Sequence, residues 1–572
     1  MLKIGIMCRS DSFHAWEASV IHNLIGYRDI SIELMILEDL PKTNLISLLR
    51  KVSWKNLFWH IYYKLWVSKM RFGSLVNMQN ELKDVSRITC QPIINDRFYQ
   101  YFSNSDLNCI RNYDLDVIIK FGFNIIRGKI LDSAKYGVWS FYPNDVTRIQ
   151  GIPSCFWEIY YVNPLTNAVL QQLTEDLDGG RIIERGYFST ISHSYIKNLN
   201  QVYNSSVLWV TRACRRILDC PSSSLFAATH SANGDSEAKI LNEQSQLSPN
   251  YKLPTNYQVV RFIFRLFINF LSRRVNHAIF KPSWTIGIVK INPEDLFQIK
   301  ELVEVTWLPS PKGSFFADPF VIKNKGKYYI FFEEYLYSRL SGHISVIETS
   351  DFQSFSSPEI VLEKPFHLSY PYVFEHDGRN YCIPEQCQTG KVVLYEARAF
   401  PRDWKEIATI LNFPGLDPTI IRHNGKWWLF TGREGGEAEL FLWVAKDLTG
   451  PWRPHPQNPI KTDIRSSRPG GRPFLLKNGN WIRPAQESSI SYGRKLVFNE
   501  IVALSETCYE ERPVHSVAPD PNGSFLEGLH TLDYASDFCI IDGLTLNISW
   551  QYASLYLKNK LLKKITQQKY SI

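Results

Sequence analysis

Apolar runs of strand length alternate with helical patterns over the first third of the chain. Residues 2–8, 30–37 and 116–121 are apolar runs, and a helical pattern at about residues 15–24 follows the first of them. This alternation predicts a parallel sheet with helices on its faces, in which ligands bind at the carboxyl ends of the strands. Neither GxGxxG nor GxxxxGK[ST] occurs in the chain, so a nucleotide site of those types is not expected.

The second half of the chain repeats a different pattern five times. Each of the first four copies has a polar or aromatic anchor with a Pro, an apolar strand, a turn containing Gly and a second apolar strand; the fifth copy is looser. The repeat length suits a blade of four short strands, which takes about 40–50 residues. The pattern therefore predicts a five-bladed β-propeller. First strands begin near the propeller axis, so the anchors should converge at one end of the channel: Asp318, Tyr370, Asp417, Arg472 and His530.

The two patterns predict an α/β, Rossmann-like first domain followed by an all-β second domain. Residues 221–250 are small and polar with little periodicity, which is typical of a linker. We therefore expect an α/β domain at 1–215 with an insertion at 42–72, a linker at 216–256, a basic amphipathic helix at 257–282, a propeller at 283–555 and a basic tail at 556–572.

The net charge of +8 is concentrated in two aromatic segments, residues 42–72 and 252–290, neither of which contains Asp or Glu. In the second segment a polar stripe recurs every four residues along an otherwise apolar helix; its members are Arg261, Arg265, Asn269 and Arg273. Such a helix fits an anionic membrane surface, and it also fits burial between two domains. Nucleic-acid binding is not expected, because the basic residues alternate with apolar ones and no recognition motif is present.

The cysteines and the start of the chain bear on cofactors and location. Ten cysteines are scattered without a CxxC pair, so neither a zinc site nor a disulfide framework is indicated, and we expect no metal. Met1 leads directly into an apolar strand, which does not resemble a signal peptide. The expected location is the cytoplasm, with contact to the inner face of the membrane as an option.

Four stretches of the first domain resemble the folate-dependent formyltransferase family: residues 136–143 (YGVWSFYP), 148–153 (RIQGIP), 156–159 (FWEI) and 177–183 (LDGGRII). In that family an Asn, a His and an Asp transfer a formyl group from N10-formyltetrahydrofolate to an amine. The resemblance implies that Ser140 stands at the Asn position, Tyr142 at the His position and Asp178 at the Asp position. Asp145 and Arg148 lie close by as polar candidates for substrate binding.

The propeller repeats carry carboxylates at positions suited to glycosidic chemistry. The sequence Ala-Asp-Pro at 317–319 resembles the five-bladed propellers of family 43 glycoside hydrolases, which invert the anomeric centre with an Asp base, an Asp that tunes pKa and a Glu acid. That resemblance implies that Asp318 is the base. Glu385 and Asp417 are the other candidate catalytic acids, and Tyr370 stands where the second blade lacks an aspartate.

The fourth repeat is crowded with cations and amide donors instead. Arginine forks bind carboxylates and phosphates with two hydrogen bonds, which suits an acidic or phosphate-linked glycan. The candidates are Arg468, Arg472, Arg483 and Gln486, with His530 from the fifth repeat. This block and residues 528–531 (GLHT) resemble the propeller domain of plant enzymes that glycosylate inositol phosphoceramides.

These features predict a carbohydrate-directed transferase of surface-glycan biosynthesis, acting on a glycan or amino sugar. Two alternatives stay open. In one, the propeller is the active hydrolase or glycosyltransferase and the first domain is a scaffold. In the other, the chain is a glycan-binding protein at the membrane that catalyses nothing. Three acids at one pocket would favour catalysis, and arginines alone would favour binding.

Overall fold

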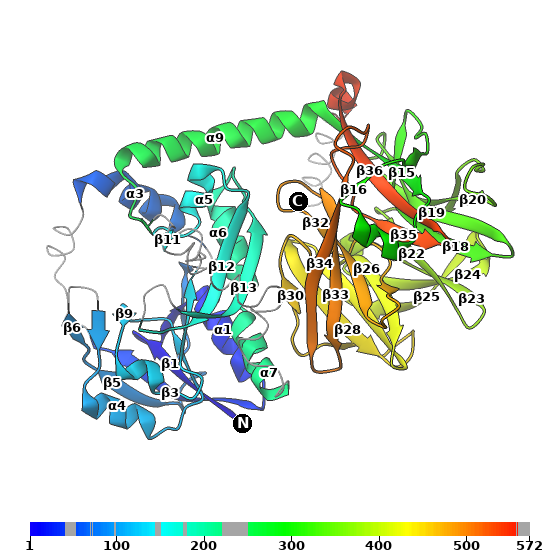
Figure 1. Cartoon of the computed structure of the whole chain (residues 1–572). Helices are drawn as coiled ribbons and strands as arrows, with labels where there is room; N and C mark the ends of the chain where they lie inside the picture. Colours follow the sequence, from blue (N-terminus) through cyan, green and yellow to red (C-terminus); the bar gives the residue numbers. More distant parts are fainter. Residues whose placement is uncertain are drawn as a thin grey trace, which may run out of the picture. The chain divides into compact units, whose positions relative to one another are not determined.

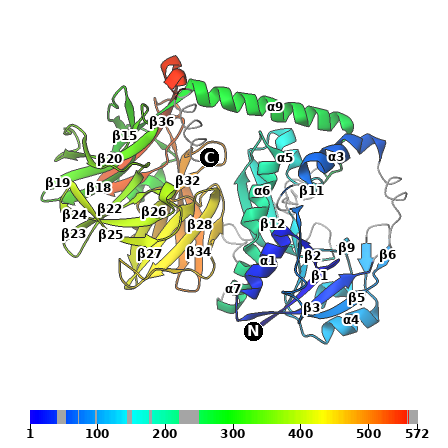
Figure 2. The same ribbon diagram turned by 180° about the vertical axis from the view of Figure 1, so that it is seen from behind.

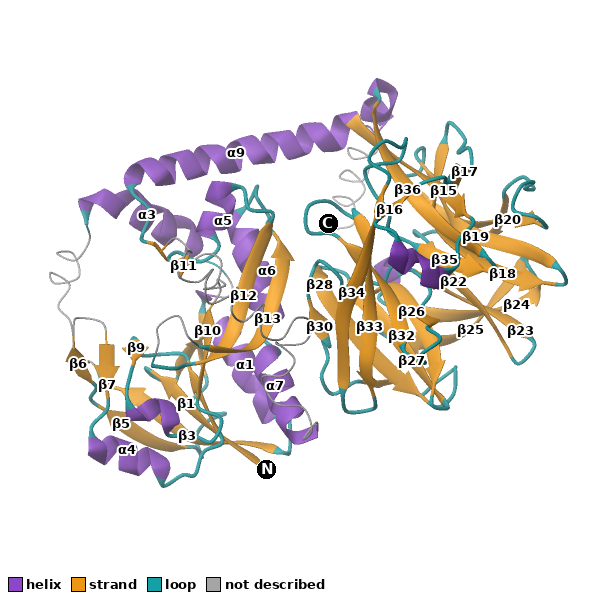
Figure 3. Cartoon of the chain, in the orientation of Figure 1, coloured by secondary structure: helices purple, strands orange, loops and turns teal. Residues whose placement is uncertain are grey.

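The computed structural model describes residues 1–39, 53–68, 70, 73–95, 99–142, 150–175, 180–219, 250–555 and 558. It divides the chain into two units, Met1–Phe270 and Leu271–Ile572, of which the first is mixed α/β and the second almost entirely β (Figures 1 and 3). Asp145, Arg148 and Asp178 lie outside the described residues, as do most of the expected linker and of the basic tail.

A seven-stranded mixed sheet forms the centre of the first unit. The strands from β10 to β5 run parallel, as the alternating pattern predicts, whereas β12 and β13 run antiparallel at one edge. Helix α1 packs on β3 and on α7, and α7 also packs on β13. The order across the sheet is β13 (Arg181–Ser189), β12 (Leu165–Gln172), β10 (Val138–Tyr142), β8 (Val117–Lys120), β1 (Leu2–Cys8), β3 (Ile30–Glu38) and β5 (Ser86–Cys90).

The helices and short strands around this sheet follow local signals in the sequence. Ser103 and Ser194, for example, accept a hydrogen bond from the backbone of the first turn of α4 and α6, respectively, which satisfies an otherwise unpaired helix donor. The helices are α1 (Ala15–Ile25), α3 (Leu57–Tyr62), α4 (Asn104–Arg111), α5 (Phe156–Tyr161), α6 (Tyr195–Ser206), α7 (Trp209–Asp219) and α9 (Asn256–Ile279). The short strands are β2 (Ser12–His14), β4 (Leu75–Asn77), β6 (Ile93–Asn95), β7 (Tyr99–Tyr101), β9 (Ile125–Ile126), β11 (Gln150–Gly151) and β14 (Asn250–Tyr251).

The described part of the second unit contains five sheets of four or five strands each, which form the five blades of a β-propeller (Figures 1 and 2). Neighbouring strands of these sheets run antiparallel, except for one short parallel pair in the fourth. The first three blades are β18 (Ser314–Asn324), β19 (Lys327–Leu336), β20 (Ser341–Thr349) and β21 (Glu359–Leu362); β22 (Ser369–His376), β23 (Arg379–Glu385), β24 (Val392–Ala399) and β25 (Asp403–Leu411); and β26 (Gly415–His423), β27 (Lys426–Arg433), β28 (Gly436–Ala445) and β29 (Arg453–Pro454), with β30 (Lys461–Thr462) beside β28.

The last two blades close the ring of the propeller. The fourth contains β31 (Phe474–Leu475), β32 (Trp481–Glu487), β33 (Lys495–Leu504), β34 (Tyr509–Pro519) and β16 (Glu301–Leu302), and the fifth contains β35 (Leu532–Ala535), β36 (Phe538–Ile548), β15 (Phe280–Val289) and β17 (Thr306–Trp307). In the fifth blade, β15 from the start of the unit pairs along ten residues with β36 from its end. This pairing joins the two ends of the propeller in one sheet and leaves no open edge between them.

Candidate functional site

Three of the repeat anchors share an uncommon backbone conformation. Asp318, Tyr370 and Asp417 have φ angles of 52°, 45° and 50°, each precedes a Pro, and each lies at an irregularity in the pairing of its blade's first two strands. A non-glycine residue in this left-handed region costs about 1–2 kcal/mol, and bulges of this kind turn a side chain away from the regular pleat. The repeated Asx- or Tyr-Pro signal therefore marks the same bulge in three successive blades.

The bulges bring anchors from different blades together around the axis. The Asp318 carboxylate accepts hydrogen bonds from the Tyr370 amide (3.2 Å) and the Thr531 hydroxyl (2.8 Å). The Tyr370 hydroxyl lies 2.9 Å from that of Thr419 and accepts a hydrogen bond from the Gly471 amide (2.8 Å). Blades one to five are thus connected through buried polar contacts, and Asp318, Tyr370, Asp417 and His530 converge as the repeat predicts.

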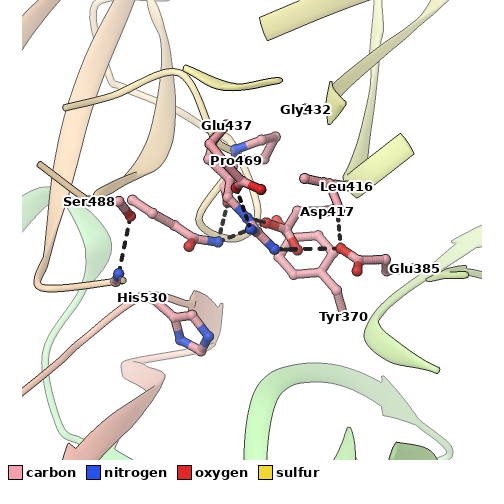
Figure 4. Close-up of polar contacts among 12 residues, drawn as sticks. Tyr370, Glu385, Leu416, Asp417, Gly432, Glu437, Pro469, Ser488 and His530 are labelled. Atoms are coloured by element: carbon pink, nitrogen blue, oxygen red, sulfur yellow. Dashed lines mark hydrogen bonds and ion pairs between the residues drawn. The ribbon is translucent and has the colours of Figure 1, made fainter. Parts of the chain in front are cut away.

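Arg468 forms the centre of one half of this network. Its guanidinium makes an ion pair with Asp417 and lies 3.6 Å from Glu385 and 3.4 Å from Glu437. The Gln486 amide also donates to Asp417, at 2.8 Å, and Glu385 accepts a hydrogen bond from the Asp417 amide, at 2.9 Å. Figure 4 shows the contacts of Asp417 and Glu385. Burial and the nearby Asp417 raise the pKa of Glu385 well above its usual range, although Arg468 opposes them.

His530 forms the centre of the other half. Its Nδ1 lies 2.6 Å from an Asp542 oxygen, out of line for a hydrogen bond but close enough for an ion pair, and its Nε2 lies 3.5 Å from Asp318. Burial alone would lower the pKa of His530, but the carboxylates of Asp542 and Asp318 outweigh it and raise the pKa. Burial raises the pKa of Asp318 to about 6, against the opposing charge of His530. The imidazole is further stacked on Trp284, with ring centres 4.0 Å apart.

The same three side chains, Asp318, His530 and Asp542, offer ligand atoms within 4.8 Å of one another, which suits a metal ion. Their atoms are already engaged, since the Asp542 carboxylate accepts hydrogen bonds from the amides of Asp318, His530 and Thr531. These amides satisfy the hydrogen-bonding capacity of the Asp542 oxygens, and the expectation of no metal stays a prediction.

Glu333 is a site residue that the sequence analysis missed. It is 6% exposed and pairs with Ala317, just as Glu385 pairs with Ser369, so each glutamate lies opposite the residue that precedes the bulged anchor of its blade. Burial and the neighbouring carboxylates raise the pKa of Glu333 well above its usual range. Aligning second strands as well as first strands would have found it. We call the whole group the axial cluster: Asp318, Glu333, Glu385, Asp417, Arg468, His530 and Asp542.

Tyr492 provides an aromatic surface beside this cluster. Its ring lies 4.9 Å from the Arg468 guanidinium and 5.3 Å from the His530 ring, and 45% of the residue is exposed. An exposed aromatic face next to buried acids and a cation is a suitable platform for a sugar ring, because the apolar face of a pyranose stacks on aromatic side chains.

Two of the predicted arginines lie elsewhere. The Arg472 guanidinium is bound to Asp533 (2.6 Å) and to the Val373 carbonyl (2.7 Å), and it lines a separate pocket with residues such as Lys323 and Ser536. Here Gly471, and not the expected Arg472, reaches the Tyr370 hydroxyl. Arg483 is 0% exposed and pairs with Glu511 at 2.6 Å, so it stabilises the fourth blade and is not available to a ligand.

In the first unit, the expected formyltransferase-like residues lie on and after β10. Ser140 is buried in the strand, between Lys120 of β8 and Gln171 of β12. Tyr142, at the end of β10, lines a cavity of about 170 Å³ together with Lys120, Gln171 and Gly180. Burial lowers the pKa of Lys120 to about 8, although Glu38 opposes it, and the buried Gln171 Oε1 has no hydrogen-bond partner among the described residues. The cavity thus has polar groups ready for a small ligand.

Fold and site together define a five-bladed propeller with a buried cluster of ionisable residues at its axis. Residues 304–524 match the family model described as "Glucosamine inositolphosphorylceramide transferase 1, N-terminal". The protein of that name from rice (Oryza sativa subsp. japonica) is 35% identical over 211 residues, which are 36% of this chain and 28% of the rice protein. Its counterpart from Arabidopsis thaliana is 35% identical over 214 residues, which are 36% of this chain and 27% of that protein. The chain therefore matches less than a third of the length of these relatives.

Solved structures of glycoside hydrolases are more distant. A family 117 enzyme of Zobellia galactanivorans is 14% identical over 48% of this chain and 93% of its own, with a TM-score of 0.32. A family 43 enzyme of Bacillus licheniformis is 18% identical over 36% of this chain and 44% of its own, with a TM-score of 0.29. Scores this low carry no argument, so the assignment of the propeller rests on its own sheets. The family match lies outside the first unit, whose resemblance to formyltransferases rests on its motif residues alone.

Proposed function

We propose that the chain is a carbohydrate-directed enzyme of glycan biosynthesis and that the axial cluster binds and activates its sugar substrate. The observation that carries this proposal is the pairing of acids with different proton affinities in one buried group. Burial and the nearby Asp417 raise the pKa of Glu385 well above its usual range, whereas the pKa of Asp318 is raised only to about 6. Glycosidic chemistry needs one acid to donate a proton and one to accept it.

In this proposal Glu385 protonates the leaving oxygen of the sugar and Asp318 accepts the proton of the attacking group. Arg468 keeps the neighbouring Asp417 compensated and turned toward the site, and the face of Tyr492 supports the sugar ring. Inversion at the anomeric carbon follows if the two acids act from opposite faces of the sugar.

The similarity to the plant proteins supports glycan biosynthesis as the setting. Their name describes transfer to an inositol phosphoceramide, and the region shared with this chain is the N-terminal part of those proteins. We therefore propose a sugar linked to a phosphate as the substrate class, with the Arg468 cation as the contact for its negative charge. Because most of the plant proteins' length is not matched, the transfer reaction itself is part of the proposal.

The competing proposal is a propeller that binds a glycan without reacting. It is favoured by the ion pairs of Arg468 and His530, which already occupy the acids of the cluster. The two proposals differ in the expected effect of replacing a single carboxyl group of the cluster. The enzyme proposal predicts a loss of turnover, and the binding proposal predicts a change in binding only.

The deciding experiment measures binding and turnover on the same full-length protein, with a panel of nitrophenyl glycosides and sugar phosphates. We expect Asp318→Asn and Glu385→Gln each to lower turnover by ~10³-fold while affinity changes only a few-fold. The control is Glu396→Gln, which removes a carboxylate paired with Arg379 outside the cluster and should leave turnover unchanged. Binding without turnover by the wild type would replace the enzyme proposal with the binding one, and no binding would overturn both.

A second proposal concerns the first unit, and the cavity at Tyr142 favours it. We propose that this cavity binds a small folate-like ligand, with N10-formyltetrahydrofolate as the candidate for a formyl transfer. Calorimetry with a non-hydrolysable formyl-folate analogue should show binding that is weakened at least ~10-fold by Lys120→Met, since Lys120 lines the cavity. The exposed Lys135→Met, outside that cavity, is the control. No binding by the wild type would rule out formyl transfer.

A further inference from the structure

The outer face of α9 is apolar and exposed to an unusual degree. Large apolar side chains cover the face opposite the one that packs on the first unit, and they are between 42% and 72% exposed: Tyr257, Val260, Ile263, Phe264, Phe267 and Ile268. At 100° per residue these six positions fall on one side of the helix. Val259 and Phe262, which are buried, lie on the other side.

Three of the four members of the polar stripe of α9 contact the first unit. The Arg265 guanidinium donates to the Tyr160 carbonyl (2.5 Å), the Asn269 amide donates to the Ser192 carbonyl (3.0 Å), and Arg261 lies 5.2 Å above the Tyr160 ring. The stripe therefore binds the helix to its own unit, and the apolar face is left outside. This is the reverse of a surface helix, whose polar side normally faces water.

Residues 53–66, in the first basic aromatic segment, continue the same surface. The Asn56 side chain donates to the carbonyls of Leu253 and Pro254, and the Asn256 side chain donates to the Trp54 carbonyl. Trp54 and Tyr257, which these contacts bring close to each other, are 83% and 72% exposed. Further exposed apolar residues of this segment are Phe58, Ile61, Leu65 and Trp66.

The charge of this surface indicates which kind of partner binds to it. Neither residues 42–72 nor residues 252–290 contain an acidic side chain, and Lys55, Lys64 and Lys252 are exposed. A second copy of the chain would place like charges against one another, which opposes self-association. Aromatic and aliphatic side chains mixed with cations instead match the boundary between the headgroups and acyl chains of an anionic bilayer. No helix among the described residues is long and apolar enough to cross a membrane.

We propose that α9 and residues 53–66 form a docking face for an anionic membrane surface, with α9 lying in the plane of the headgroups. Phe264 and Phe267 enter the acyl boundary and the lysines contact lipid phosphates. The first unit is then held at the surface of the membrane, where a sugar attached to a lipid phosphate is available. The docking itself does not depend on the sugar chemistry proposed above.

Sedimentation of the full chain with vesicles tests this proposal. We expect binding to vesicles of phosphatidylcholine with phosphatidylserine, weaker binding to phosphatidylcholine alone, and loss of binding as salt increases. Phe264→Glu with Phe267→Glu should weaken binding at least ~10-fold. The matched control is Ile360→Glu with Leu475→Glu, which charges two apolar side chains that are each 52% exposed in the propeller.

Two results would overturn the proposal. One is equal sedimentation of the wild type and the α9 double variant with the anionic vesicles. The other is a concentration-dependent dimer in light scattering that the α9 double variant abolishes, which would assign the face to a second copy of the chain. Circular dichroism of both variants confirms that a loss of binding is not a loss of folding.

Discussion

Arg468 stands between the buried carboxylates of Asp417 and Glu385. Each of these groups is costly to bury alone, so their arrangement is stable only while the charges compensate one another. Two arginines of the fourth repeat have different roles because their surroundings in the folded propeller differ. Arg468 reaches the axial cluster, whereas Arg483 is fully buried in a structural ion pair with Glu511.

Replacing Arg468 should therefore destabilise the propeller. We expect Arg468→Met to lower the free energy of unfolding by about 3–5 kcal/mol at pH 7, because it leaves the buried Asp417 carboxylate without its cation. Denaturant titration followed by tryptophan fluorescence measures the change. Arg465→Met, which removes a partly exposed pair with Asp463, should cost less than about 1 kcal/mol. Equal effects of the two variants would contradict this account of the cluster.

Glu511 predicts a specific acid sensitivity. Burial alone would raise its pKa, but Arg483 and Lys461 outweigh burial and lower the pKa to about 2. A lowered carboxyl pKa contributes stability that is complete above the unfolded value, near 4.5, and is lost as pH falls toward 2. The contribution is at most about 3 kcal/mol. Between pH 6 and 2 the free energy of unfolding should therefore fall less steeply with pH for Glu511→Gln than for wild type. Equal slopes for the two proteins would contradict this account.

At the scale of the elements, the bulged first strands position the site. Positive φ angles at Asp318, Tyr370 and Asp417 recur where each blade meets the axis, so the blade repeat and the site share one backbone feature. In the fourth blade the backbone of Gly471, whose φ is 119°, lies close to the backbone of the next blade. A Cβ there would collide with the Leu532 carbonyl oxygen of the next blade.

Gly471→Ala should therefore be among the most damaging small substitutions in the propeller. We expect a loss of more than about 3 kcal/mol in unfolding free energy, since both the backbone angle and the space exclude a side chain. Gly479→Ala separates the two causes, because Gly479 has a φ of 87° but no atom within 4 Å of the added carbon. It should cost only about 1 kcal/mol, and thermal melts of the two variants give the comparison.

At the scale of the whole molecule, the two units have separate cores and separate sheets. The propeller closes on itself through β15 and β36, and the first unit is organised around its own seven-stranded sheet. Neither sheet takes a strand from the other unit. The units therefore meet the physical requirements for independent folding.

Calorimetry of the full chain should accordingly show two unfolding transitions. We expect Arg468→Met to move only the transition of the propeller, and residues 271–572 expressed alone to reproduce that transition within a few degrees. A single transition that Arg468→Met shifts as a whole would mean that the two units unfold cooperatively.

Much of this architecture was readable from local patterns. The alternation of strands and helices predicts the parallel part of the first sheet, and the recurring X-Pro anchors predict the blades and the convergence of Asp318, Tyr370 and Asp417. Strand period, turn residues and blade length are short-range properties, so they can be predicted from residues that are close together in the sequence. For the same reason α9 could be predicted as a basic amphipathic helix at about its observed position.

Tertiary structure alone decided which charges meet and which faces remain exposed. Asp417 and Arg468 are 51 residues apart in the chain, and Asp318 and Thr531 are 213 apart, so no local pattern specifies their contacts. The antiparallel edge of the first sheet, the burial of Arg483 and the contacts of the α9 polar stripe with the first unit likewise follow from packing between distant segments. Proton affinity depends on burial and on these long-range neighbours, so the sequence determined the positions of the acids, and the folded propeller determined in which of them the pKa is shifted.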